Sequence, residues 1–479
     1  MTDGTNTIDS YAIPERFGNG DSLHMNVRCI YGAGIALLLA ATAGAQEDGD
    51  LERRVRELEE RLEASEARNE ELSREVRRSN REIVEREIDD YLERTQELSG
   101  AATAGTETKK GAFFKLYGFI RFDLYYNTAR TPNTILPSVV SPEDGVAASP
   151  NDESFALDVR LTRIGFEFDF GKVGNTDVTG RIETDFANFP SGVPESRETP
   201  RIRVAYIQLE SAKWRARLGQ DWDIFSPLYA SVNFETMMWN VGNLGDRRPM
   251  AAILYKGAGK LTLEAALGLT GAINNQDLDA AVMPPTFTST DRDGFDSGAP
   301  HVQLRAAYAG DGWVEGKGWV VGVGAAIATL ETDTSFGGNT DFTSWAVSFD
   351  FFVPITQALL VKGEWWFGQG LGDFRGTIGQ FINSATGNEI EGWGGWTELQ
   401  YAHSDRWAFH MGGTVDDPSN GDVPAGSPEL NFTFYGGVRR QWSNRLKSGF
   451  DVIFWETQYA GATQLGNMVR FNFYTSVDF

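Results

Sequence analysis

The last twelve residues of the chain alternate between apolar and polar side chains. Counting back from Phe479, every second residue can face an apolar medium, whereas the residues between them are mostly polar. The apolar series is Val477, Thr475, Phe473, Phe471 and Val469. Strict alternation over this length predicts a β-strand with one apolar and one polar face. Such a strand suits the end of a soluble β-sandwich as well as a membrane barrel.

Similar alternation runs from Phe113 to the C-terminus, with no helical stretch inside it. The pattern predicts about sixteen strands. They lie near residues 113–128, 154–170, 178–189, 201–211, 214–226, 248–256, 261–273, 300–310, 318–332, 343–354, 357–370, 389–403, 406–417, 431–442, 445–459 and 468–479. In the second strand the outward series is Phe155, Leu157, Val159 and Leu161, followed by Ile164, Phe166 and Phe168. This slip of one residue predicts a β-bulge at Thr162 and Arg163.

The connections between these strands alternate in length. Short turns lie near 171–175, 211–213, 257–260, 353–356, 404–405 and 443–444. The longer connections lie near 129–153, 190–200, 227–247, 274–299, 333–342, 371–388, 418–430 and 460–467. Short turns on one rim and long loops on the other are typical of outer-membrane barrels. We therefore expect residues 113–479 to form an all-β transmembrane barrel of about 16 antiparallel strands, which at this size encloses an aqueous channel.

The first 112 residues follow other patterns. An apolar run at 29–45 ends in Ala43-Gly44-Ala45 and predicts a signal peptide within residues 1–45; a transmembrane anchor is the alternative. A heptad repeat over 46–98 predicts an α-helical coiled coil in the periplasm, and 99–112 is a flexible linker. A pattern seen in three-stranded coiled coils points to a homotrimer, although a charged single helix is also open. Its residues are Arg54, Val55, Leu58, Glu59 and Leu62.

Composition narrows the class of protein. A hydrophobic content of 41% and a mean hydropathy of −0.32 exclude a helical membrane protein, but in a barrel only alternate residues meet lipid. The net charge of −24, without a basic domain, argues against nucleic acid as a partner. The single cysteine, Cys29, lies in the expected leader, so no disulfide is expected. No cofactor or metal is expected, since the acidic segment 291–296 lacks the further ligands of a calcium loop.

Alternation places many arginines on the inner face of the expected barrel. They are Arg121, Arg160, Arg163, Arg181, Arg201, Arg203, Arg215 and Arg217 on the first five strands, with Arg470 on the last strand beside Arg121. Arginine on the lipid face would cost about 2–4 kcal/mol at mid-membrane. A wall of arginines favours the passage of small anions. Alternatively, these side chains pair with acids such as Glu183 and Asp185 and stiffen the wall. Later strands add the inward acids Glu264, Glu364 and Glu398.

The third long connection is unusually apolar for an exposed loop. In sixteen-stranded porins the third loop folds inward and narrows the pore. The residues of this chain that would then line the constriction are Tyr229, Phe234, Glu235 and Trp239. Packing of the loop against a neighbouring subunit is the alternative.

Five stretches together resemble the DcaP-like trimeric outer-membrane porins. They are KLYGFIRFD at 115–123, RLTRIGF at 160–166, RIRVAY at 201–206, LGQDWDIF at 218–225 and GDRRP at 245–249. The family is also similar in its N-terminal coiled coil. The resemblance implies a homotrimer in the outer membrane that passes small anionic solutes such as dicarboxylates. It also implies that Arg121, Arg160, Arg163, Arg201 and Arg203 are pore residues.

Two other functions stay open. A structural outer-membrane protein could tether the envelope through its coiled coil. An outer-membrane hydrolase would need a Ser/His or Asp/His pair, but none of His301, His403 and His410 falls in a recognisable nucleophile motif. We therefore expect a channel and no enzyme.

Overall fold

The computed structural model describes residues 106–107, 113–142, 152–188, 199–233, 238–257, 260–270, 297–461 and 465–479. The expected leader, the coiled coil with its five trimerisation residues and most of the linker lie outside this part of the chain. Those expectations, and the domain boundaries that depend on them, stay predictions.

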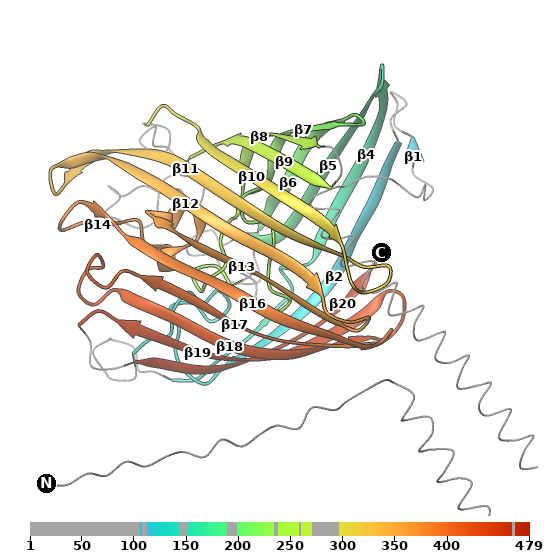
Figure 1. Ribbon diagram of the computed structural model, residues 1–479. Helices are drawn as coiled ribbons and strands as arrows, with labels where there is room; N and C mark the ends of the chain where they lie inside the picture. The colour runs from blue at the N-terminus through green and yellow to red at the C-terminus, as the bar shows by residue number, and fades with distance from the viewer. Residues whose placement is uncertain are drawn as a thin grey trace, which may run out of the picture. The chain divides into compact units, whose positions relative to one another are not determined.

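The described residues form one antiparallel sheet that closes on itself (Figure 1). The first half contains β1 (Thr106–Glu107), β2 (Phe113–Asn127), β3 (Ser154–Asp158), β4 (Arg163–Val173), β5 (Thr176–Asn188), β6 (Thr199–Glu210), β7 (Trp214–Trp222), β8 (Arg247–Lys256), β9 (Leu261–Gly268) and β10 (His301–Asp311). The second half contains β11 (Gly318–Phe336), β12 (Asn339–Pro354), β13 (Leu359–Gln369), β16 (Glu391–Ser404), β17 (Trp407–Pro418), β18 (Pro428–Gln441), β19 (Leu446–Tyr459) and β20 (Gly466–Asp478).

These elements make a ring of sixteen strands. The sheet has eighteen, but β3 and β4 both pair with β2 as two parts of one interrupted strand, and the two-residue β1 pairs only with Phe113 and Phe114 at the start of β2. The expected closed barrel of 16 antiparallel strands is confirmed for the described residues. None of their helices is long and apolar enough to cross a membrane.

The last strand closes the ring against the first. In the β2–β20 register, Asn127 lies opposite Arg470 and Phe119 opposite Asp478, and the amide of Phe479 donates to the carbonyl of Gly118 at 3.0 Å. The expectation that Arg470 lies beside Arg121 is wrong. Arg121 lies opposite Ser476, six positions further along β20 than Arg470, because the antiparallel register pairs Arg470 with Asn127.

The bulge expected in the second strand is present. Between the pairs Phe119–Arg163 and Asp123–Asp158, β2 has three residues and its partner has four. The amide of Thr162 donates to the carbonyl of Val159 at 3.0 Å, so the backbone turns there. This turn ends the alternation before Leu161, whose expected outward position is wrong because its side chain is buried.

One expected long loop is a tight hairpin instead. Strands β11 and β12 extend to Phe336 and Asn339, so only Gly337 and Gly338 connect them where a loop over 333–342 was expected. Their φ values of 58° and 96° lie in the region that two-residue hairpins require and glycine readily adopts. The short turns otherwise gather at the end of the barrel that carries the C-terminus (Figure 1).

The two faces of the strands differ as alternation requires. On β2, the outward Ile120 is 66% exposed, whereas the inward Asp123 is fully buried. Burial of an inward carboxylate means that something covers it from inside the ring. The covering elements are two connections, described next.

Candidate pore constriction

The connection between β7 and β8, residues 223–246, contacts the inner face of the barrel; we call it the inner loop. Its backbone amides donate to three inward carboxylates on β13, β16 and β19. The pairs are Leu228 with Glu364 at 2.7 Å, Ser231 with Glu398 at 2.7 Å, and Asn233 with Asp451 at 3.0 Å. All three carboxylates are buried. Buried acids with backbone donors hold a loop in place, because an unmet charge or amide there would be costly.

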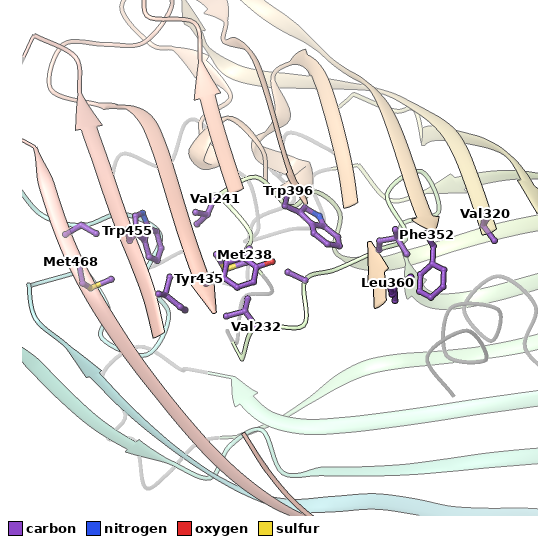
Figure 2. Packing of buried hydrophobic residues seen from close by; sticks show 14 of the residues in the cluster. Val232, Met238, Val241, Val320, Phe352, Leu360, Trp396, Tyr435, Trp455 and Met468 are labelled. Atoms are coloured by element: carbon purple, nitrogen blue, oxygen red, sulfur yellow. The ribbon is translucent and has the colours of Figure 1, made fainter. Parts of the chain in front are cut away.

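Apolar contacts hold the same loop. Val232, Met238 and Val241 of the inner loop pack with side chains from the surrounding strands (Figure 2). The partners include Val320, Phe352, Leu360, Trp396, Tyr435, Trp455 and Met468. In a soluble protein such residues would form a central core. Here they form a layer between the barrel wall and the loop, so the loop is part of the packed structure.

The second half of the inner loop is held by side-chain donors from the wall. The indole of Trp366 donates to the carbonyl of Gly242 at 2.8 Å, and that of Trp396 donates to the side-chain oxygen of Asn243 at 2.9 Å. The buried Trp366 and Trp396 thus contribute both apolar area and a fixed donor.

A second connection supports the inner loop from the other side. Residues 370–390, here called the second loop, contain η3 (Leu371–Phe374), η4 (Thr377–Gly379), β14 (Ile382–Asn383) and β15 (Asn388–Glu389). The carbonyl of Phe374 accepts from the amide of Gly245, and that of Arg375 accepts from Asn240, both at 2.9 Å. Arg248 on β8 donates to Asp373 at 2.7 Å. The two loops therefore form one assembly.

This assembly contains strained backbone. Five non-glycine residues have positive φ within the described part of the chain, and all five lie in the two loops: Met238, Asn240, Arg375, Thr377 and Ile378. Positive φ costs a non-glycine residue about 1–3 kcal/mol, and such strain persists only where the surroundings hold it. The hydrogen bonds and apolar contacts of the two loops with each other and with the barrel wall hold these residues in place.

On the opposite side, a cavity separates the inner loop from β4–β9. Five of the predicted pore residues line it: Arg163, Arg181, Arg203, Arg215 and Arg217. The carboxylates on its lining belong to Glu183, Asp221, Asp223 and Glu264, and the loop contributes uncharged residues between 226 and 245. The wall side of the cavity thus carries five arginines and three carboxylates, and the loop side carries one carboxylate, that of Asp223.

The arginines of this wall are paired. Arg203 donates to Glu183 at 2.6 Å and to Asp185 at 2.8 Å, while Arg201 donates to Asp185 at 2.7 Å. Arg217 donates to Asp221 at 2.7 Å and lies over the Tyr206 ring. The remaining pairs are Arg163 with Glu183, Arg181 with Glu167, and Arg215 with Glu210. Local pairing, the alternative left open by the sequence, is therefore extensive.

Four predicted pore residues do not line this cavity. Arg121 pairs with Asp123 and contacts Asn233 of the inner loop. Arg160 is fully buried and pairs with Asp158. Arg201 pairs with Asp185 beside the cavity, and Arg470 is buried, where it donates to the carbonyl of Thr134 at 2.6 Å. The inward acids from later strands are also engaged, with Glu264 accepting from Arg305 at 2.9 Å.

Of the predicted constriction residues, Tyr229 and Trp239 line the cavity, whereas Phe234 and Glu235 lie outside the described residues. The Trp239 ring lies 6.3 Å from that of Trp222 and packs against the guanidinium of Arg375. Sequence reasoning missed Arg375, because its loop lies far along the chain and has no strand alternation to indicate a face.

An acid joins the arginines at this point. Asp246 accepts from Arg375 at 2.7 Å and lies 3.5 Å from Arg247. Burial alone would raise the pKa of Asp246, but the two guanidinium groups outweigh burial and hold the pKa below its usual range. Asp246 is therefore charged at neutral pH and links the two loops electrostatically.

A closed ring of sixteen strands with an inward-packed loop is the architecture of a porin-type barrel. The crystal structure of the outer membrane channel DcaP of Acinetobacter baumannii is similar, with a TM-score of 0.61 and 15% identity over 79% of this chain and 100% of that chain. An anion-selective porin from Comamonas acidovorans has a TM-score of 0.50 and 11% identity over 77% of this chain and 100% of that chain. The resemblance to DcaP-like porins is confirmed in the fold. No protein-family model matches the sequence, and neither does any curated protein.

Proposed function

We propose that this protein is an outer-membrane porin that forms a water-filled channel for the passive diffusion of small hydrophilic solutes. The observation that carries the proposal is the arginine-lined cavity left between the inner loop and β4–β9. The wall of the ring has a closed backbone hydrogen-bond network, as a membrane interior requires. The likeness in fold to the channel DcaP adds support for the outer-membrane location.

The proposed channel prefers small anions such as dicarboxylates, and the preference is modest. The cavity lining carries five arginines and four carboxylates, and most arginines are paired. Among the described residues of the inner loop that line the cavity, Asp223 is the one that carries a charge. Five arginines against four carboxylates leave the lining with a small positive excess, which gives a passing anion a weak net attraction. The similar fold of an anion-selective porin is consistent with this polarity.

Self-association as a homotrimer, with the coiled coil of residues 46–98 in the periplasm, is part of the same proposal. The heptad pattern with Arg54, Leu58 and Glu59 supports it. An apolar heptad seam is stable only against a partner, and identical chains supply three identical seams. A tether to the envelope is compatible with this arrangement, since the coiled coil and the barrel are separate segments.

The geometry favours a channel over a hydrolase. His410 lies 2.7 Å from Asp451, which is the kind of pair a hydrolase could use. Asp451, however, also accepts from the amide of Asn233 and from Arg439 at 3.0 Å. These contacts bind the inner loop to the wall, so the histidine completes a structural network.

The proposal is tested by recording from the full chain in planar bilayers under a KCl gradient. We expect discrete conductance steps, in threes for a trimer, with a reversal potential on the anion-selective side. The double variant Arg215→Gln/Arg217→Gln should shift that potential toward the cation side. The matched control is Arg406→Gln, because Arg406 is exposed in the short turn between β16 and β17.

A protein that inserts but stays silent would overturn the porin proposal. A conducting protein with cation selectivity would overturn the anion preference alone. An equal shift of the reversal potential in the Arg406→Gln control would mean that the arginines of the cavity lining do not determine the ion selectivity.

A further inference from the structure

An arginine on the outer face of the barrel contacts two exposed tryptophans. Arg440, near the end of β18, lies directly opposite Trp407 of β17 and Ser448 of β19. Alternate residues of a strand share one face, so Arg440 lies on the same side of β18 as Phe432 and Phe434, which are both exposed. Arg440 therefore points away from the channel, toward the lipid side of the wall.

The guanidinium of Arg440 lies over both aromatic rings. Its central carbon is 4.4 Å from the centroid of the Trp407 ring and 5.0 Å from that of Trp442, which follows β18. The Trp442 ring is itself fixed, because its indole donates to the Ser448 hydroxyl at 3.1 Å. A guanidinium that stacks on aromatic rings keeps the N–H groups at the edge of its plane available as donors.

Arg440 has no anionic partner in the described part of the protein. No carboxylate there forms an ion pair with it, and its buried Nε atom makes no hydrogen bond. Lysines at the same end of the barrel are paired, as Lys115 is with Glu167 at 3.9 Å and Lys172 with Asp177 at 3.0 Å. A buried donor without an acceptor is costly, so an anion from outside the protein would complete the contacts of Arg440.

The charges in the flanking turns do not supply that anion. Asp405 and Arg406 are adjacent and opposite in charge, and Lys447 pairs with Asp478 at 3.1 Å. The turn between β18 and β19 adds Arg445, which is exposed and forms no ion pair within the described residues. The balance around the stacked arginine is therefore positive and suits an anionic ligand.

The position of Arg440 along the barrel axis limits what the anion can be. Trp407 and Trp442 lie at short turns, as do the exposed Trp214 and Trp313, and these turns gather at the end of the barrel that carries the C-terminus (Figure 1). Exposed tryptophans in such a belt mark the level of the lipid headgroups, and short turns face the periplasm in outer-membrane barrels. Arg440 therefore lies at the level of lipid phosphates.

We propose that Arg440, Trp407 and Trp442 form a binding site for the phosphate of an anionic phospholipid in the periplasmic leaflet of the membrane. The edge of the guanidinium donates to the phosphate oxygens, and the two indole rings pack against the glycerol backbone. Phe409 and Phe434, exposed on the same two strands further from the turns, contact the acyl chains. The inference goes beyond the porin function and requires only that the barrel spans a membrane.

The test is native mass spectrometry of the full chain, folded in detergent and titrated with dioleoyl phosphatidylglycerol. We expect one lipid per chain to be retained, and Arg440→Gln to bind it about tenfold more weakly, because hydrogen bonds from a charged donor are lost. Arg440→Lys should lie between the two, since it keeps the charge but loses the planar N–H groups. Heat-dependent gel mobility reports whether each barrel has folded.

The matched control is Lys213→Gln, which removes one exposed positive charge from the short turn between β6 and β7. Its lipid affinity should equal that of the unaltered protein. An equal loss of affinity in Lys213→Gln and Arg440→Gln would mean that the lipid responds to net charge alone, and the proposed site would be wrong.

A second variant removes the rings and keeps the arginine. Each contact between a cation and an exposed aromatic ring contributes about twofold to fivefold in affinity, so Trp407→Leu/Trp442→Leu should also weaken lipid binding. This variant decides the matter if Arg440→Gln does not fold. Unchanged affinity in both variants would overturn the inference.

Two competing ligands identify the chemistry of the site. Phosphatidylcholine with the same acyl chains should bind about fivefold more weakly, because its headgroup has no net negative charge. Inorganic phosphate in excess should not displace the lipid. Equal retention of phosphatidylcholine would mean that only the acyl chains are bound, and displacement by inorganic phosphate would assign the site to the free ion; either result would overturn the inference.

A contact between copies of the chain is the remaining alternative for this face. It would appear as dissociation of the oligomer in Arg440→Gln with no change in lipid affinity, and that result would overturn the lipid site. None of these measurements depends on conduction, so a failure of the porin proposal and a failure of the lipid site are distinguishable.

Discussion

The two walls of the barrel use the same kind of residue in opposite ways. On β5–β7, inward charges pair with one another along the wall, as Arg203 does with Glu183 and Asp185. On β13–β19, inward acids such as Glu364 and Glu398 bind the backbone of the inner loop. Alternation puts both sets on the inner face. What separates them is whether a loop covers the face, so one wall supports the inner loop and the other borders the cavity.

The largest change in stability is expected from a substitution on the cavity side of the barrel. Arg203→Met removes the guanidinium that bridges two buried acids and leaves Glu183 with Arg163 alone and Asp185 with Arg201 alone. Removing one partner of a buried ion pair typically costs about 3–5 kcal/mol. The free energy of unfolding in detergent, measured by urea titration, should fall by the lower end of that range, because Arg163 and Arg201 still pair with the two acids. Arg201→Met is the comparison, because it removes a single pair, that with Asp185, and should cost less than Arg203→Met; an equal loss in the two variants would contradict the bridging role of Arg203.

On the opposite wall, Glu364→Ala should loosen the inner loop while the barrel itself stays folded. It deprives the amide of Leu228 and the hydroxyl of Ser226 of their acceptor, at a cost of about 1–3 kcal/mol for each buried donor. We expect larger and noisier single-channel currents with a barrel that still resists SDS at room temperature. Glu331→Ala is the control, because Glu331 is exposed on β11. Equal currents in both variants would exclude Glu364 as an anchor.

The smallest effect tests one hydrogen bond. Trp366→Phe keeps most of the ring but loses the donor to Gly242, so the free energy of unfolding should fall by about 1 kcal/mol. Its neighbour Trp365 points outward, and its exposed indole donates to the Thr397 hydroxyl at 3.1 Å; because that hydrogen bond is exposed, Trp365→Phe should change stability by less than about 0.5 kcal/mol. Thermal unfolding of both variants in the same detergent provides the measurement. A larger loss of stability in Trp365→Phe than in Trp366→Phe would contradict the placement of Trp366 on the inner face and Trp365 on the outer face.

Much of the fold could be predicted because a strand has a period of two. That period indicated the strands, the inward side of Arg203 and the bulge near Thr162, each of which depends only on local order. Predictions from the local sequence pattern were wrong at two points. Leu161 is buried because the bulge begins earlier than the pattern suggests, and Gly337-Gly338 makes a hairpin where a loop was expected.

The candidate site was less predictable because its contacts are distant in sequence. Leu228, Ser231 and Asn233 bind acids that lie 136, 167 and 218 residues further along the chain. Alternation says that such acids point inward but gives no position along the barrel axis. It also says nothing about Arg375, whose role depends on a loop conformation that its neighbours in space impose.

The sequence by itself determined a barrel of about sixteen strands, its inner and outer faces and the apolar character of the loop that packs inside. These follow from side-chain polarity and a two-residue period. Only the tertiary structure decided which charges meet. Closing the ring fixes the register of every strand, and the inner loop then covers Glu364 and Glu398 but leaves Arg215 and Arg217 on the lining of the cavity.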